Sequence, residues 1–160
     1  RVRSSAASDV YKRQSRVREG ENLKKDLLAK LSAMSDIVAY IEEKSPQIIE
    51  DYKARLIEKV DELAINTQID DQRIAAEVTM YADKVCVDEE VVRLRSHIDS
   101  TIKILTEGGA VGRKLDFIVQ EMNREANTIL SKANSLIISD KGIDLKTEIE
   151  KVREQIQNIE

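Results

Sequence analysis

Apolar residues recur at intervals of three or four positions through most of this chain, which is the spacing of an amphipathic helix. The stripes cover residues 23–41, 49–63, 74–82, 91–105, 115–133 and 145–159. No segment shows the alternation of apolar and polar residues that is typical of a half-buried strand. The pattern therefore predicts an all-α fold.

The first two stripes predict a long antiparallel helical hairpin over residues 15–66. One helix is expected over residues 15–44, and the next runs to about Leu63. Between them, Ser45 is a good N-cap residue and Pro46 suits the first position of a new helix. Two long amphipathic helices with so short a connection are expected to fold back on each other.

The remaining stripes predict a compact helical domain over residues 70–160. Asp70 is expected to cap its first helix, and Asp88 to begin its second. The pair Gly108-Gly109 is expected to end that second helix, because glycine readily takes the left-handed backbone conformation. The boundary between the last two helices is the least defined by the pattern.

Residues 1–14 read RVRSSAASDVYKRQ and show no sustained helical period. Part of this run resembles a translated sequencing-adaptor artefact, of the kind found at the ends of assembled metagenomic reading frames. We therefore expect these residues to be either non-native or a disordered basic arm, with the native segment beginning near Ser15.

The composition suits long helices around a modest aliphatic core, because 35% of the residues are charged and only 3% are aromatic. The net charge of −4 argues against broad binding to duplex backbones, so a nucleic acid would need a local basic patch. Cys86 is the only cysteine, which excludes an intrachain disulfide and favours a reducing compartment such as the cytoplasm. The sequence contains no run that is apolar over membrane-spanning length, and no phosphate-binding loop or zinc-ligand spacing.

Residues 112–133 carry the most unusual polar face of any predicted helix. That face includes Asn123 and Asn127, which are mediocre helix formers. It also includes Glu121 and Glu125, whose like charges a turn apart mildly destabilise an isolated helix. A face that accepts such local costs is often functional.

The same stretch matches the signature of a known family. The matching segments are residues 112–117 (GRKLDF), 120–128 (QEMNREANT), 131–132, 88–90, 93–97, 145–146, 148–150 and 153–160. Through them the chain resembles the C-terminal part of the bacterial YicC (YloC) family. The resemblance implies an endoribonuclease that acts on RNA, assembly as a hexamer, and an additional N-terminal domain that is missing from this sequence.

We predict that His97, Glu121 and Glu125 are the catalytic residues. Glu121 and Glu125 project from one helix face, and hard divalent cations such as Mn²⁺ or Mg²⁺ prefer carboxylate oxygens, so the pair is the predicted metal site. Imidazole side chains can change charge near neutral pH, so His97 could move a proton during phosphodiester cleavage. In the alternative interpretation, both glutamates pair with Arg124, Lys132 or Arg93, and His97 only caps the contact between two helices.

Basic residues within the matching segments are candidates for contacts with RNA phosphates: Arg93, Arg95, Arg113, Lys114, Arg124 and Lys132. Their alternative role is intramolecular ion pairing. Phe117 could stack on a base, although packing against a neighbouring helix or subunit is the favoured interpretation. Relatives usually carry acidic residues where Ser135 and Ile137 stand here, which counts against a metal or substrate role for that segment.

The leading hypothesis is the C-terminal portion of an endoribonuclease that cleaves single-stranded RNA with a divalent metal. One alternative is an oligomerisation module, in which catalysis needs the missing N-terminal domain. Another is a module that binds RNA without cleaving it. We expect RNA as the partner, no membrane association, and a homo-oligomer smaller or weaker than the family's hexamer.

Overall fold

The computed structural model describes residues 2–63, 70–109 and 111–158, with side chains from residue 13 onward. These residues form no strand. Their helices are α1 (Val2–Leu63), α2 (Asp71–Val85), α3 (Asp88–Glu107), α4 (Gly112–Lys132) and α5 (Leu136–Gln157). The predicted all-α fold is confirmed. None of the described helices is long and apolar enough to cross a membrane.

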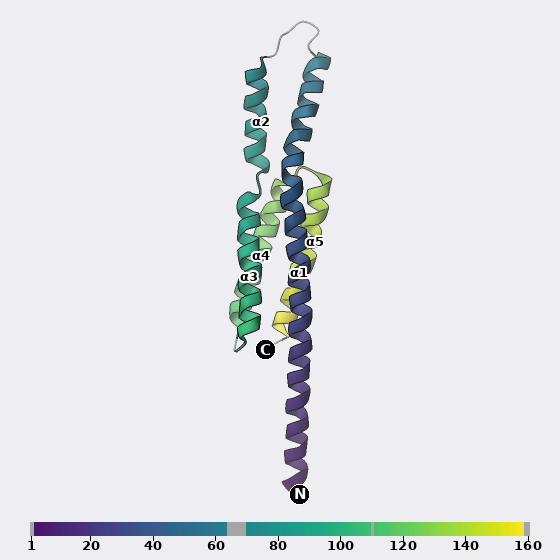
Figure 1. The fold of residues 1–160 in the computed structure, drawn as a ribbon, viewed down its shortest axis with the longest axis vertical. Coiled ribbons are helices and arrows are strands. Elements are labelled where there is room, and N and C mark those ends of the chain that lie inside the picture. The colour runs from purple at the N-terminus through teal and green to yellow at the C-terminus, as the bar shows by residue number, and fades with distance from the viewer. Residues whose placement is uncertain (1, 64–69, 110, 159–160) are drawn as a thin grey trace.

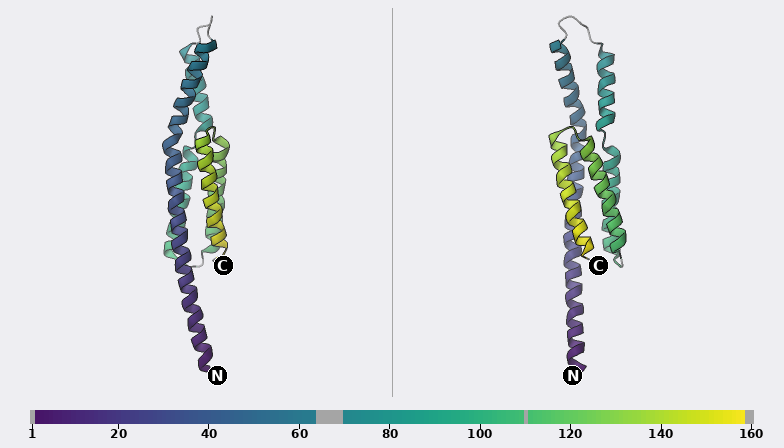
Figure 2. Two further views of the ribbon diagram at one scale, coloured as in Figure 1. Left: turned by 90° about the vertical axis from the view of Figure 1, so that its right-hand side faces the viewer. Right: turned by 180° about the vertical axis from the view of Figure 1, so that it is seen from behind.

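Four of the helices form an antiparallel bundle (Figure 1). α1 packs against α3 and α5, and α4 completes the ring by packing against the same two helices on the other side. α2 lies end to end with α3 and packs against the part of α1 that extends above the bundle (Figures 1 and 2). The chain therefore consists of a bundle with a two-helix arm at one end, formed by α1 and α2.

The bundle has an aliphatic core to which all four helices contribute. The core residues of α1 are Leu27, Leu31, Met34, Val38 and Ile41. The largest fully buried side chains of α3, α4 and α5 are Leu94, Ile98, Leu115, Met122, Ile129, Ile138, Leu145 and Ile149. Full burial of one such side chain stabilises the fold by about 1.5–3 kcal/mol. Residues 13–22 of α1 are exposed throughout, because the helix continues past the end of the bundle there (Figure 1).

The predicted turn at Ser45-Pro46 is wrong, because α1 continues through both residues. A proline inside a helix lacks the N–H of one backbone hydrogen bond and destabilises the helix by about 3 kcal/mol. Ser45 Oγ donates a hydrogen bond to the Ile41 carbonyl oxygen at 2.8 Å. The hairpin expected within residues 15–66 is therefore made by α1 and α2 instead.

The reason lies in the apolar stripe of α1, which keeps its phase across the proline. Ile48, Tyr52 and Leu56 continue at helical spacing the buried stripe that reaches Ile41. Tyr52 stacks on Tyr81 of α2, with ring centroids 3.7 Å apart and an interplanar angle of 9°. Because α3 and α2 together cover one continuous side of α1, their packing favours a straight helix over the predicted turn. The predicted break at residues 66–69 lies outside the described residues.

The N-terminal segment also differs from the expectation. Residues 2–14, expected to be non-native or disordered, continue α1 as helix. Their native origin stays a prediction. The division of the chain into a hairpin at residues 15–66 and a domain at residues 70–160 also stays a prediction. The buried residues of α1 join one core with those of α3, α4 and α5.

The other helix boundaries agree with the sequence prediction. The Asp70 side chain caps α2 by accepting a hydrogen bond from the Gln72 backbone N–H at 3.2 Å. α3 begins at Asp88 and is followed by Gly108 and Gly109, whose φ angles are 74° and 100°. These left-handed values are strained for other residues, so the two glycines allow the tight reversal from α3 into α4.

Candidate functional site

Charged side chains line one edge of the contact between the antiparallel helices α3 and α4. Lys132 Nζ lies 2.8 Å from Glu90 Oε1, and Arg93 Nε lies 3.0 Å from Glu125 Oε1. Lys132 and Glu125 belong to α4, whereas Glu90 and Arg93 belong to α3. We call these four residues the charged seam.

Glu90 is the most buried member of the charged seam, with only 3% of its surface exposed. One carboxylate oxygen accepts a hydrogen bond from Lys132, and the other has no hydrogen-bond partner among the described residues. Lys132 Nζ also donates to the Cys86 carbonyl oxygen at 3.0 Å. Lys132 therefore ties the end of α4 both to the first turn of α3 and to the short break between α2 and α3.

Arg93 is surrounded by three carboxylates. Its side-chain nitrogens lie 3.3 Å from Glu89, 3.5 Å from Glu90 and 3.0 Å from Glu125. The hydrogen bond to Glu125 raises the pKa of Arg93 above its ordinary value, and the charges of the glutamates act in the same direction. In this arrangement the guanidinium group of Arg93 contacts carboxylates of its own chain, and these contacts compete with any contact to an RNA phosphate.

Glu121 and His97 extend the same edge by one turn. His97 follows Arg93 by four residues on α3, and Glu121 precedes Glu125 by four residues on α4, so the antiparallel register carries both to the next turn of the contact. Both side chains are partly buried. The structure therefore places His97, Glu121 and Glu125 along one edge.

The two glutamates of the predicted metal site differ in their surroundings. Glu125 is 7% exposed and is paired with Arg93, as the alternative interpretation expected. No ion pair to Glu121 is found among the described residues. Nor do any three histidine, cysteine or acidic residues converge on a possible metal position within the part of the chain that the structure describes. The described chain thus supplies a pair of carboxylates and not a complete metal site.

The other basic candidates lie outside the charged seam. Arg95 pairs with Glu42 of α1, on the side of α3 that faces that helix. Arg113, Lys114 and Arg124 are exposed on α4, and the structure shows no ion pair to them within residues 13–63, 70–109 and 111–158. These three cations are the ones most accessible to a phosphate.

Phe117 is 63% exposed on α4, so it does not pack into the core of this chain. It belongs to a row of exposed residues along α4: Arg113, Phe117, Gln120, Arg124, Asn127 and Ser131. We call this row the outer stripe. In the view from behind, α4 and α5 face the reader and no described helix lies in front of α4 (Figure 2).

Neither Glu90 as a member of the site nor the outer stripe as a unit was predicted from the sequence. Glu90 precedes the buried Leu94 by four residues, and Glu125 follows the buried Met122 by three. An acidic residue at a position flanking an apolar stripe is therefore the signal that would have found both buried glutamates.

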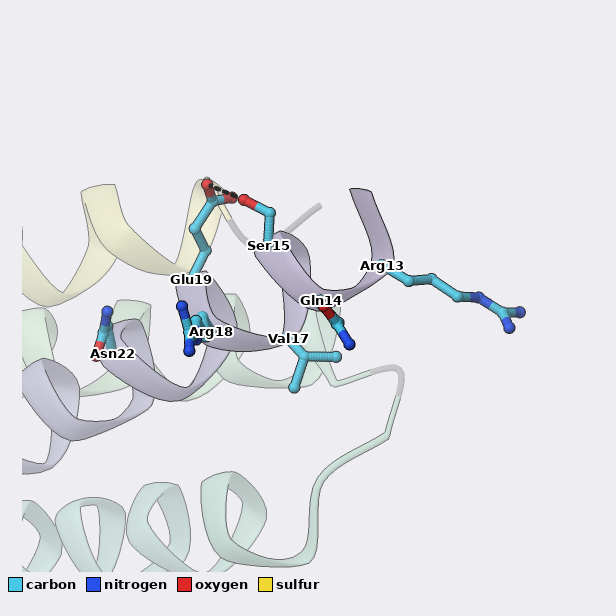
Figure 3. A pocket seen from close by; sticks show the side chains of 7 residues that line it. All are labelled: Arg13, Gln14, Ser15, Val17, Arg18, Glu19 and Asn22. Atoms are coloured by element: carbon cyan, nitrogen blue, oxygen red, sulfur yellow. Dashed lines mark hydrogen bonds between the residues drawn. The ribbon is translucent and has the colours of Figure 1, made fainter. Parts of the chain in front are cut away.

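A surface hollow outside these two faces contains no comparable arrangement (Figure 3). It lies along the isolated N-terminal part of α1 and is lined by Arg13, Gln14, Ser15, Val17, Arg18, Glu19 and Asn22. One hydrogen bond links these residues, from Ser15 Oγ to Glu19 Oε1 at 3.3 Å, while Arg13 points away from the others. Side chains that diverge from a single helix do not make a binding site, so the seam and the outer stripe remain the candidates.

Comparison with known proteins supports the sequence resemblance. A family model described as endoribonuclease YicC-like, C-terminal, matches residues 41–160. The chain is 41% identical over 149 residues to "Probable endoribonuclease YicC" of Clostridioides difficile (strain 630), covering 92% of this chain and 51% of that protein. It is 39% identical over 145 residues to the protein of the same name from Haemophilus influenzae, covering 91% and 50%. The chain thus spans about half the length of the curated relatives it matches.

Proposed function

This chain belongs to the family described as endoribonuclease YicC-like, C-terminal, and on that premise we propose that it acts as the C-terminal portion of an endoribonuclease. Its substrate in this proposal is single-stranded RNA. The observation that carries the proposal is the position of His97 and Glu121 on one edge of the α3–α4 contact, within the matched residues and beside the Arg93–Glu125 pair.

The proposed chemistry follows from these side chains. His97 accepts or donates the proton that moves during phosphodiester cleavage, because an imidazole changes charge near neutral pH. Arg93 holds the Glu125 side chain in place, and the Glu90–Lys132 pair links the same two helices beside it. Arg113, Lys114 and Arg124 are the proposed contacts to RNA phosphates.

Use of Mn²⁺ or Mg²⁺ is a separate part of the proposal. Mg²⁺ is commonly held by one or two protein carboxylates together with substrate phosphates. Glu121 fits such a role better than Glu125, one of whose oxygens is taken by Arg93. Because the described residues do not complete a metal site, we derive no catalytic step through the ion.

A cleavage assay on labelled unpaired RNA, with EDTA, Mn²⁺ or Mg²⁺, tests the proposal. We expect cleavage by the parent chain, its loss in His97→Asn, and retention in Glu107→Gln, which changes an exposed acid at the far end of α3. A longer family member serves as the positive control. If that protein cleaves while this chain does not under any condition, catalysis requires the part of the relatives that this chain does not span, and the proposal for the fragment is wrong.

Assembly of several copies is a second proposed function, favoured by exposed apolar residues on α5. Leu136, Ile137 and Ile143 are 82%, 52% and 56% exposed. The family resemblance implies a hexamer, and we propose a smaller or weaker homo-oligomer for this chain. Light scattering over a range of concentrations should show association, whereas a strict monomer at high concentration would contradict it. The proposed location is the bacterial cytoplasm, where RNA and reduced thiols coexist.

A further inference from the structure

The outer stripe of α4 gathers chemically related residues on one narrow face. At 100° per residue, its six side chains fall within an arc of about 80°, opposite the face that packs into the bundle. The first and last, Arg113 and Ser131, are separated by about 27 Å at the helical rise of 1.5 Å per residue. A row of this length on a straight helix can follow an extended ligand.

The stripe itself carries cations and no acid, although the whole chain contains 30 acidic and 26 basic residues. Arg113 and Arg124 flank Phe117 along the stripe. Lys114, the residue after Arg113, adds a third cation in the first turn of α4. Asp116 borders the stripe, and there it accepts a hydrogen bond from Gln120 Nε2 at 2.8 Å. This charge pattern complements a polyanion such as the backbone of RNA.

Phe117 adds a feature that phosphate binding alone does not require. Its ring is 63% exposed, and no aromatic or cation–π partner of the ring is found among the described residues. Proteins that bind single-stranded nucleic acids combine cations along the backbone with aromatic rings on which the bases stack. A base paired within a duplex does not offer its face, so a ring between two arginines fits an unpaired strand.

We propose that the outer stripe is the docking surface for the unpaired RNA strand, with Phe117 stacking on a base while Arg113 and Arg124 contact phosphates on either side. This inference rests on the proposed function for the substrate class, and it separates binding from chemistry. The strand is held on the outer face of α4, and the predicted catalytic residues lie on the edge facing α3. Glu121 lies between the two faces, about 80° around the helix from Arg113.

Fluorescence anisotropy of a labelled, unpaired RNA oligonucleotide in EDTA tests binding without cleavage. Phe117→Leu keeps an apolar side chain of similar size and removes the aromatic face. We expect the dissociation constant to rise by about 5- to 150-fold, the range that corresponds to the loss of stacking on one base. Met80→Ala, which changes an apolar residue of α2 that is 68% exposed, should leave the dissociation constant unchanged. Equal affinities of the parent and Phe117→Leu would overturn the inference.

Three further arms separate this inference from its rivals. A duplex of the same sequence should compete poorly with the unpaired strand, and equal competition would contradict base stacking. His97→Asn should bind like the parent; if it does so while no protein in the set cleaves RNA, the enzymatic proposal fails and the docking surface stands. If Phe117→Leu changes the oligomeric state in light scattering and not the RNA affinity, the outer stripe is a contact between copies and the inference is wrong.

Discussion

Two faces of α4 use similar residues in opposite ways. On the charged seam, Lys132 and Glu125 are paired with Glu90 and Arg93 of the neighbouring helix, and both glutamates are buried. On the outer stripe, the exposed cations have no ion pair among the described residues, and an aromatic ring faces solvent. One helix thus carries charges that are used by the fold and charges that are available to a ligand.

The difference shows why basic residues within one matched signature cannot be treated as one group. A guanidinium group that already contacts three carboxylates, such as Arg93, gains little from a phosphate unless those contacts break. Replacing a residue of the seam should therefore change the stability of the fold. Replacing a residue of the outer stripe should change only the affinity for RNA.

The largest expected effect is on the seam at Lys132. Lys132→Met keeps the length of the side chain but removes the 2.8 Å contact of the buried Glu90 carboxylate, which then keeps the longer 3.5 Å contact to Arg93. Because the lysine is one-third exposed, we expect a loss of about 2–3 kcal/mol in the free energy of unfolding, below the range for a fully buried pair. Urea unfolding measures it, with Lys103→Met as the control. Lys103 is 75% exposed and its change should stay within about 0.5 kcal/mol. A similar result for both variants would refute the structural role of the seam.

The two glutamates on α4 should respond differently to the same substitution. Glu125→Gln removes the partner of Arg93, which is half exposed, and we expect a loss of about 1–2 kcal/mol. Glu121→Gln should stay within about 0.5 kcal/mol, because no ion pair to it is found among the described residues. Unfolding curves of the two variants decide this. If Glu121→Gln were the more damaging change, the assignment of Glu125 to the fold would be wrong.

A smaller effect is expected on the outer stripe at Arg124. For single strands, the logarithm of the binding constant falls with the logarithm of salt concentration by about 0.7 per phosphate neutralised. Arg124→Gln should therefore reduce this slope by about 0.7, with no change in the unfolding curve. Arg95→Gln is the comparison, since Arg95 already pairs with Glu42. An unchanged slope in Arg124→Gln, or an equal change in Arg95→Gln, contradicts the division between the faces.

The smallest effect concerns a contact away from α4. A hydrogen bond from Gln155 of α5, followed by the charge of Lys30, holds the pKa of Asp26 on α1 below its ordinary value of 3.8. Since the folded pKa is depressed, this contact stabilises the fold above pH 3.8 and the stabilisation is lost as the pH falls through the folded value. Comparison of the parent with Asp26→Asn across this range should show a small difference that disappears in acid. A difference that grows in acid would have the wrong sign.

Much of the fold could be predicted because its signals are local. Asp70, Gly108 and Gly109 act through the backbone of their own turns, so the ends of α2 and α3 are readable from the sequence. Pro46 shows the limit of such reasoning. Its helix-start signal is local, whereas the packing of α2 and α3 along α1 that overrides it involves residues far away in the chain.

The site could be predicted only in part, for a related reason. Helical spacing places Glu121 and Glu125 one turn apart, but it does not tell which of them faces α3 and becomes buried. Pairing of Glu125 with Arg93 was one of two open alternatives, and only the register of α3 against α4 selects it. The exposure of Phe117 likewise depends on the order of helices around the bundle, which the apolar pattern alone does not define.

Photo-crosslinking to an unpaired uridine-containing RNA tests the division between the two faces most directly. Trypsin cleaves after Lys114 and Arg124, so residues 115–124, which include Phe117, form one peptide that mass spectrometry can identify. We expect an RNA adduct on this peptide in the parent, and its loss in Phe117→Leu. An adduct confined to peptides of α5 or of the α1–α2 arm, with residues 115–124 unmodified, would contradict it.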